Sequence, residues 1–169
     1  GTTHVENLDK YYGLLKDMLL DPGFRTEDFN RLRDDATNFL KVSLRESNDE
    51  ELGKEHLYNT IYSGHPYGHH NVGKLSSLQK LTIDDVRAFY RAHYTTANLV
   101  IGLAGGYPKE FSSKVEADFA KLPEGQPDKK RFDSPKLPAG TQIRIIARDT
   151  RSTAISLGFP IEVNRSHKD

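Results

Sequence analysis

The chain contains no cysteine and no tryptophan, and it has a single methionine. The absence of cysteine excludes disulfides, thiolate nucleophiles and zinc sites built on cysteine. A net charge is also absent, because 24 basic and 24 acidic residues cancel. Such a chain has no field that attracts phosphates, so we expect no nucleic-acid partner. We interpret its one basic run, Lys129–Lys130–Arg131, as a solvated loop.

Long hydrophobic runs are absent as well. The longest apolar stretches, such as Leu99–Ala104, fall far short of the ~20 residues that a membrane helix needs, so we expect no membrane span. No signal-peptide pattern is present, and nothing indicates a compartment. With 36% hydrophobic residues and a mean hydropathy of −0.67, the chain is polar for a self-sufficient domain. We therefore expect part of its apolar surface to meet something else. Because it opens with Gly1 and holds only Met18, we expect a piece of a longer protein.

Apolar residues spaced three and four apart predict several amphipathic helices. Thr26 and Thr82 are suitable N-caps, and Thr82-Ile83-Asp84-Asp85 is a variant of the capping box. Proline and two glycines within Ser63–Gly68 exclude helix there. The predicted helices cover residues 5–20, 26–47, 49–61, 75–81, 82–93 and 108–121.

Continuous apolar runs predict three strands, at Asn98–Ala104, Gln142–Ala147 and Thr153–Phe159. The proline-rich stretch 123–140 without periodicity is the predicted linker. The fold class expected is therefore α+β, with helices packed on a mixed β-sheet. Residues 1–122 would form the helix-rich part of one lobe, and the strands in 141–169 would open the next lobe.

The run from His65 to Gly105, HPYGHHNVGKLSSLQKLTIDDVRAFYRAHYTTANLVIGLAG, resembles insulinase/pitrilysin-type metallopeptidases. In that family an HPYG turn, a glycine-containing spacer, a helix and a strand follow one another with similar spacing. The resemblance implies a mitochondrial-processing-peptidase-like fold of paired lobes that close around a peptide. It implies zinc in the full-length protein, peptide substrates, and the remaining lobes or a partner subunit as partners.

Two departures from this family concern chemistry. The motif H-x-x-E-H, whose histidines bind zinc and whose glutamate is the general base, does not occur in this chain. The helix at residues 26–47 corresponds to the one that carries a further glutamate ligand, where the family tends to show two glutamates seven apart. Here Asp34 is followed by Lys41, and Asp35 by Val42. Either Glu46 serves as the ligand, or this copy binds no metal.

Other residues invite a functional interpretation. His65, His69 and His70 could be zinc ligands, but Pro66 and Gly68 break the helix that would align them, and we favour a packed turn. An acidic run and three serines could carry acid–base or nucleophilic chemistry. The acids also suit a helix start, and the serines lack a Gly-x-Ser-x-Gly elbow. These residues are Asp49, Glu50, Glu51, Ser152, Ser156 and Ser166.

The glycine-rich stretch Gly102–Gly106 lacks the spacing of a nucleotide-binding loop, and the stripe Phe111/Val115/Phe119 is expected to be core. We therefore assign no catalytic, metal-binding or cofactor-binding residue within the chain. The function expected is part of a zinc-dependent metallopeptidase whose zinc motif lies elsewhere. The alternatives are a non-catalytic peptide-binding half or partner subunit of the same fold, and an unrelated interaction domain.

Overall fold

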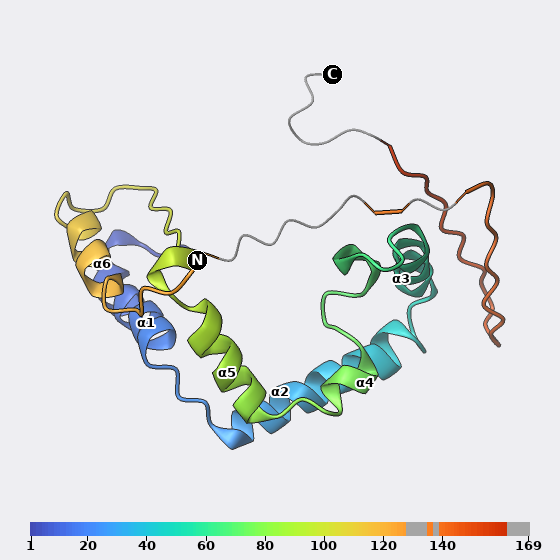
Figure 1. The fold of residues 1–169 in the computed structure, drawn as a ribbon, viewed down its shortest axis with the longest axis horizontal. Helices are drawn as coiled ribbons and strands as arrows, with labels where there is room; N and C mark the ends of the chain where they lie inside the picture. Colours follow the sequence, from blue (N-terminus) through green and yellow to red (C-terminus); the bar gives the residue numbers. More distant parts are fainter. Residues whose placement is uncertain (128–134, 137–138, 162–169) are drawn as a thin grey trace. The chain divides into compact units, whose positions relative to one another are not determined.

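The computed structural model describes residues 1–127, 135–136 and 139–161 (Figure 1). The basic run at 129–131 and Ser166 lie outside these residues. The chain divides into two compact units, Gly1–Asn30 with Leu81–Lys130 and Arg31–Lys80 with Arg131–Asp169. The lobe boundary expected at residues 123–140 stays a prediction.

The described residues of the first unit form three complete α-helices and two 3₁₀ turns. The helix α5 begins with the predicted capping box, in which the Thr82 side chain accepts from the Asp85 N–H and the Asp85 carboxylate accepts from the Thr82 N–H at 2.8 Å. Each half of the box satisfies an amide that the helix itself leaves unpaired. The elements are η1 (Val5–Asn7), α1 (Leu8–Leu20), α5 (Ile83–His93), η4 (Thr96–Asn98) and α6 (Phe111–Phe119).

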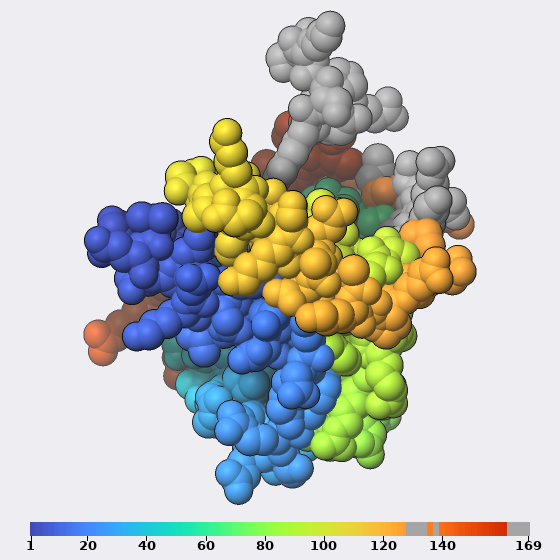
Figure 2. Space-filling view, turned by 90° about the vertical axis from the view of Figure 1, so that its left-hand side faces the viewer, coloured from blue at the N-terminus to red at the C-terminus, as the bar shows by residue number. Residues whose placement is uncertain are grey.

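The core of this unit lies between α1 and α6. Tyr12 packs edge-on against Phe111, with 5.1 Å between ring centroids, and Val115, Phe119 and Leu122 complete the buried cluster. Figure 2 shows α1 in blue directly beside the orange and yellow residues of α6. The stripe Phe111/Val115/Phe119 is therefore core, as its helical spacing predicted.

The second unit is built on α3 (Asp49–Ile61), with α4 (Leu75–Leu78) and the turn η3 (Pro66–Gly68). The helix α2 (Thr26–Asn38), which contains the division between the units, continues as a π-helical segment, η2 (Phe39–Leu44). The predicted helix at residues 26–47 is thus helical as far as Leu44. Leu40 and Leu44 are the largest fully buried side chains among the described residues. They anchor the π-helical segment in the second unit.

The predicted α+β class is wrong for the described residues, which contain helices and turns but no β-strand and no sheet. No backbone ladder joins the three apolar runs expected to be strands in the described part of the chain, and Asn98 of the first run belongs to η4. Val100 in the first run is 94% exposed. A helix satisfies its hydrogen bonds locally, whereas a strand needs a neighbour, and an apolar run does not specify that neighbour.

The HPYG turn is closely packed. His65 caps it by accepting the Tyr67 N–H at Nδ1, and the Asn59 side-chain amide donates to the Gly68 carbonyl at 2.7 Å. Gly68 is buried, and a Cβ placed there would lie 2.4 Å from the Tyr62 carbonyl oxygen. Only glycine fits here, because the Tyr62 backbone, unlike a flexible side chain, cannot move to make room for a Cβ.

We predict that Gly68→Ala lowers the free energy of unfolding by about 1–3 kcal/mol, since the new methyl overlaps backbone. Gly13→Ala is the matched control, because a Cβ at that position in α1 meets nothing within 4 Å. It should raise stability by about 0.5–1 kcal/mol through helix propensity. Urea unfolding followed by circular dichroism measures both. Equal effects of the two substitutions would contradict the packing described for the turn.

Tyr12 makes the first unit sensitive to alkaline pH. Burial, followed by the hydrogen bond that its hydroxyl donates to Asp118 at 3.0 Å, raises the pKa of Tyr12 to about 12. The folded state therefore retains a proton that the tyrosine of the unfolded chain loses near pH 10, the ordinary pKa of a phenol.

The contribution of Tyr12 to stability is complete below pH 10 and is lost as the pH rises toward 12. We predict a fall of about 2–3 kcal/mol over that range, from the free-energy equivalent of a pKa shift. Tyr12→Phe should flatten the dependence but leave a smaller slope, because burial also raises the pKa of Tyr90. Urea titrations at pH 9 to 12 test this prediction. A slope that Tyr12→Phe leaves unchanged would contradict it.

Candidate binding cleft on helix α3

The first turn of α3 contains the acidic run Asp49–Glu51. The Asn48 side-chain oxygen accepts from the Glu51 N–H at 3.0 Å, and the acids in the first turn oppose the helix dipole. Glu50 and Glu51 each lie 2.8 Å from the Lys54 ammonium. These hydrogen bonds lower the pKa of Glu50 and raise the pKa of Lys54. Both glutamates are thus engaged in local ion pairs.

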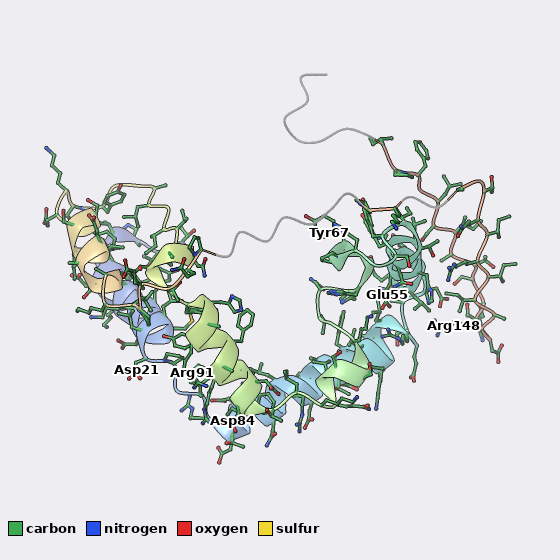
Figure 3. All side chains as sticks on the ribbon, viewed as in Figure 1. Asp21, Glu55, Tyr67, Asp84, Arg91 and Arg148 are labelled. Carbon is green, nitrogen blue, oxygen red and sulfur yellow. The ribbon has the colours of Figure 1, made fainter. Side chains whose placement is uncertain are left out.

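Asp49 has a different partner. Arg148 donates from Nη1 to the Asp49 carboxylate and from Nη2 to the Glu46 carbonyl oxygen at 2.8 Å. Thr150 donates its hydroxyl to the other Asp49 oxygen at 3.1 Å. Figure 3 labels Arg148 on the extended segment that runs beside α3. These contacts join residues about 100 positions apart, so no local pattern in the sequence could have shown them.

A cleft of about 390 Å³ lies between α3 and residues 142–156. Its helical wall carries Leu52, Leu57 and His56, and the opposite wall carries Gln142, Arg144 and Ser156. The walls combine aliphatic surface with hydrogen-bonding groups and a guanidinium. A concave surface of this volume and mixed character falls in the range of small ligand sites.

The cleft does not assemble a nucleophilic centre. Ser152 and Ser156 both line it, but in the described part of the chain neither hydroxyl is joined by a hydrogen bond to a histidine or a carboxylate. Ser156 instead lies against Gly53 of α3. The arrangement can bind a ligand, but it offers no activated hydroxyl for acyl transfer.

Arg45 connects α3 to the π-helical segment. Its guanidinium donates to the Leu40 carbonyl at 2.7 Å and to Glu55 of α3 at 3.0 Å, so it satisfies a carbonyl at the irregular turn. The second Glu55 oxygen is buried without a protein partner among the described residues. The pairing joins the π-helical segment η2 to α3, and sequence reasoning did not anticipate it.

The candidate zinc ligands do not converge. His65 and His70 each use Nδ1 to accept a backbone N–H, from Tyr67 and Val72, both at 3.2 Å. His69 uses Nδ1 to pair with the His70 carbonyl at 3.0 Å. Among the residues that the structure describes, no group of three or more His, Asp or Glu side chains could hold a metal ion. The described residues therefore do not fit a zinc ion.

The residues that we compared with the family's glutamate zinc ligand are exposed. Lys41 lies on the π-helical segment with its side chain exposed, as are Asp34 and Glu46. Glu46 contributes its backbone carbonyl to Arg148 rather than its carboxylate. In the first unit, Gly102–Gly106 lines a separate, mainly apolar pocket of about 430 Å³ beside α1 and α6. The glycines of this stretch do not have the spacing of an anion-binding loop.

Comparison with known proteins gives one consistent family. A model of the family described as peptidase M16 inactive domain matches residues 80–169. An uncharacterized zinc protease of Rickettsia felis is 26% identical over 155 residues, which are 91% of this chain and 36% of that protein. A probable mitochondrial-processing peptidase subunit beta of Arabidopsis thaliana is 25% identical over 161 residues, 90% of this chain and 29% of that protein.

A structural match agrees with these relatives. The crystal structure of a peptidase M16 inactive domain from Pseudomonas fluorescens superposes with a TM-score of 0.67 at 22% identity. The match covers 78% of this chain and 32% of that one, and it shows a shared fold. The chain spans about a third of the length of the curated relatives it matches. Within the described residues, every helix is too short or too polar to cross a bilayer.

The Arg45 bridge joins two elements of the second unit, so we expect its removal to be costly. Arg45→Met keeps the aliphatic stem but leaves the Leu40 carbonyl and the Glu55 carboxylate without their donor. We predict a loss of about 1–3 kcal/mol, because partly buried acceptors then lack a partner. Urea unfolding measures the loss.

Lys54→Met is the control for this substitution, since Lys54 forms its ion pairs on the exposed side of the same helix. Exposed pairs contribute ~0–1 kcal/mol, so this variant should lose less. If Lys54→Met costs as much as Arg45→Met, the bridge is not the constraint that joins the two helices.

Proposed function

The chain belongs to the peptidase M16 inactive-domain family, and we propose that it forms a non-catalytic, peptide-binding part of a zinc-dependent peptidase. The family match covers residues 80–169 of 169, just over half of the chain, and it confirms the resemblance found in residues 65–105. The zinc ligands and the general base of the complete enzyme would lie outside this chain. Relatives named zinc protease and mitochondrial-processing peptidase subunit beta support this placement within a larger peptidase.

The cleft on α3 is the observation that carries the proposal. It presents aliphatic side chains of α3 opposite Gln142 and Arg144, which can hydrogen-bond the backbone of an extended peptide. No catalytic set is assembled in its described walls. A surface that holds a chain segment without reacting with it is what a non-catalytic part of a peptidase contributes, because positioning the peptide lowers the entropic cost of the reaction elsewhere.

Lys41 favours a second candidate function. Its exposed ammonium stands on the helical segment that we compared with the family's glutamate ligand. A protonated lysine has no free lone pair for Zn²⁺ and repels the cation. On this observation, the chain would belong to a non-catalytic half or partner subunit of the same fold, and a separately encoded subunit would supply the zinc.

Zinc content and cleavage of a quenched fluorescent peptide, measured on the full-length protein and on this chain alone, test the proposal. We predict about one zinc per full-length protein together with cleavage, and neither for the 169-residue chain. Addition of a chelator should abolish the cleavage.

If the full-length protein holds no zinc and cleaves nothing, the partner-subunit function replaces the first proposal. Zinc and cleavage in the 169-residue chain alone would contradict both, because the catalytic site would then lie within this chain.

A further inference from the structure

The charged side chains that line the cleft on α3 differ in whether they already have partners. Asp49 and His56 come from the helix, and Arg144 and Arg148 come from the opposite wall. Arg148 donates to one Asp49 oxygen, and Thr150 donates to the other at 3.1 Å. Asp49 is the only acid among the described lining residues, and both of its oxygens are therefore occupied.

Arg144 brings a second guanidinium to the cleft. Within the part of the chain that the structure describes, no hydrogen bond or ion pair engages its side chain. Because Arg148 neutralises Asp49, the lining keeps the positive charge of Arg144, and His56 adds another when it is protonated. A cleft of this sign attracts anionic groups and repels cationic side chains.

A carboxylate fits this arrangement better than a phosphate does. The planar fork of a guanidinium donates two parallel hydrogen bonds to the two oxygens of a carboxylate. A phosphate monoester carries roughly −1.5 to −2 charges at neutral pH, whereas Arg148 of the two lining guanidinium groups is already paired. Asp49 would also repel a dianion. The charge of the cleft therefore matches a single carboxylate.

The remaining lining suits the rest of a peptide. Leu52 and Leu57 of α3 and Ile145 and Ile146 of the opposite wall supply aliphatic surface, and the Gln142 amide can both donate to and accept from a peptide backbone. The cleft volume of about 390 Å³ exceeds what a carboxylate alone would fill. The cleft thus has room for neighbouring peptide atoms around the charged group.

Contacts between the two walls set the width of the cleft. A Cβ built on Gly53 would lie 3.5 Å from the Ser156 Cβ, and one built on Gly158 would lie 3.1 Å from the Leu57 side chain. The Asp49–Arg148 pair joins the same two walls. Since these contacts exist before a ligand arrives, less conformational entropy is lost when one binds.

We propose that the cleft on α3 binds peptides through a carboxylate, which Arg144 holds by two parallel hydrogen bonds. The carboxylate belongs either to an Asp or Glu side chain or to the free C-terminus of the peptide, because Arg144 recognises the same group in both. The peptide part of this proposal rests on the proposed function. The carboxylate part rests on Arg144 and on the Asp49–Arg148 pair.

Four short peptides of one alanine–leucine background, each with an uncharged fluorophore at the N-terminus, separate the two sources. They carry a central Gln with an amidated end, a central Glu with an amidated end, a central Gln with a free C-terminus, and a central Lys with an amidated end. Fluorescence anisotropy at low ionic strength gives their dissociation constants. We expect at least one carboxylate peptide to bind roughly tenfold or more tightly than the neutral peptide, and the lysine peptide to bind most weakly.

Variants of Arg144 test which group recognises the carboxylate. Arg144→Gln should remove the preference, so that carboxylate and neutral peptides bind alike. Arg144→Lys keeps the charge but not the fork, and it should retain only part of the preference. Arg151→Gln is the matched control, because Arg151 is an exposed arginine on the same segment outside the cleft lining. If it weakens the preference as much as Arg144→Gln does, the proposal is overturned.

A titration with capped glutamate, N-acetylglutamate methylamide, tests the carboxylate site without a peptide. It should shift the backbone amide signals of residues 49–60 and 142–148 in ¹⁵N NMR spectra, whereas capped glutamine should not, and Arg144→Gln should remove the shifts. Equal affinity for the neutral peptide and both carboxylate peptides overturns the carboxylate proposal but leaves peptide binding. Shifts with capped glutamate but no binding of any peptide contradict the proposed function and leave the carboxylate site. No response to either kind of ligand overturns both.

Discussion

The second unit depends on how Arg45 joins the π-helical segment η2 to α3. Its guanidinium bonds the Leu40 carbonyl within the π-helical segment and Glu55 on the facing helix, while Leu40 and Leu44 are fully buried there. A π-helical segment has i→i+5 backbone bonds, and the Arg45 side chain adds a donor to one of its carbonyls. The packed HPYG turn and the cleft both lie against α3.

The described residues leave several large apolar side chains exposed. The described part of the chain holds no assembled metal or nucleophilic centre, and large apolar side chains remain uncovered on residues 100 and 143–161. Its relatives are about three times as long. Contiguous exposed apolar surface normally marks a place of contact. The exposed apolar surface supports the proposal that this chain contacts another part of a larger protein.

The helices could be predicted from the sequence because their causes are local. Spacing of apolar residues and caps such as Thr82 with Asp85 act within a few positions, and α3, α5 and α6 formed close to the expected bounds. The packed HPYG turn was likewise expected. The π-helical ending of α2 was not, since nothing in the local pattern distinguishes it from an α-helical turn.

Features that depend on distant partners were missed. Strand prediction failed because an apolar run such as residues 98–104 carries no information about a neighbour with which to pair. The Arg148–Asp49 contact joins an arginine that lies in no motif to an acid in the first turn of α3. From the local pattern, Asp49 was expected only to oppose the helix dipole. The stacked pair Tyr58–Tyr62, four residues apart, could have been found from its spacing. The cleft, by contrast, exists only through these long-range contacts.

The central claim is that this chain binds peptide on α3 without cleaving it. Hydrogen exchange of the chain, with and without an excess of peptides from a tryptic digest of casein, tests it most directly. The proposed function predicts slower exchange of amides in residues 49–61 and 142–156, with the peptides recovered intact. Unchanged exchange in those residues, or cleavage of the peptides by the chain alone, would contradict the claim.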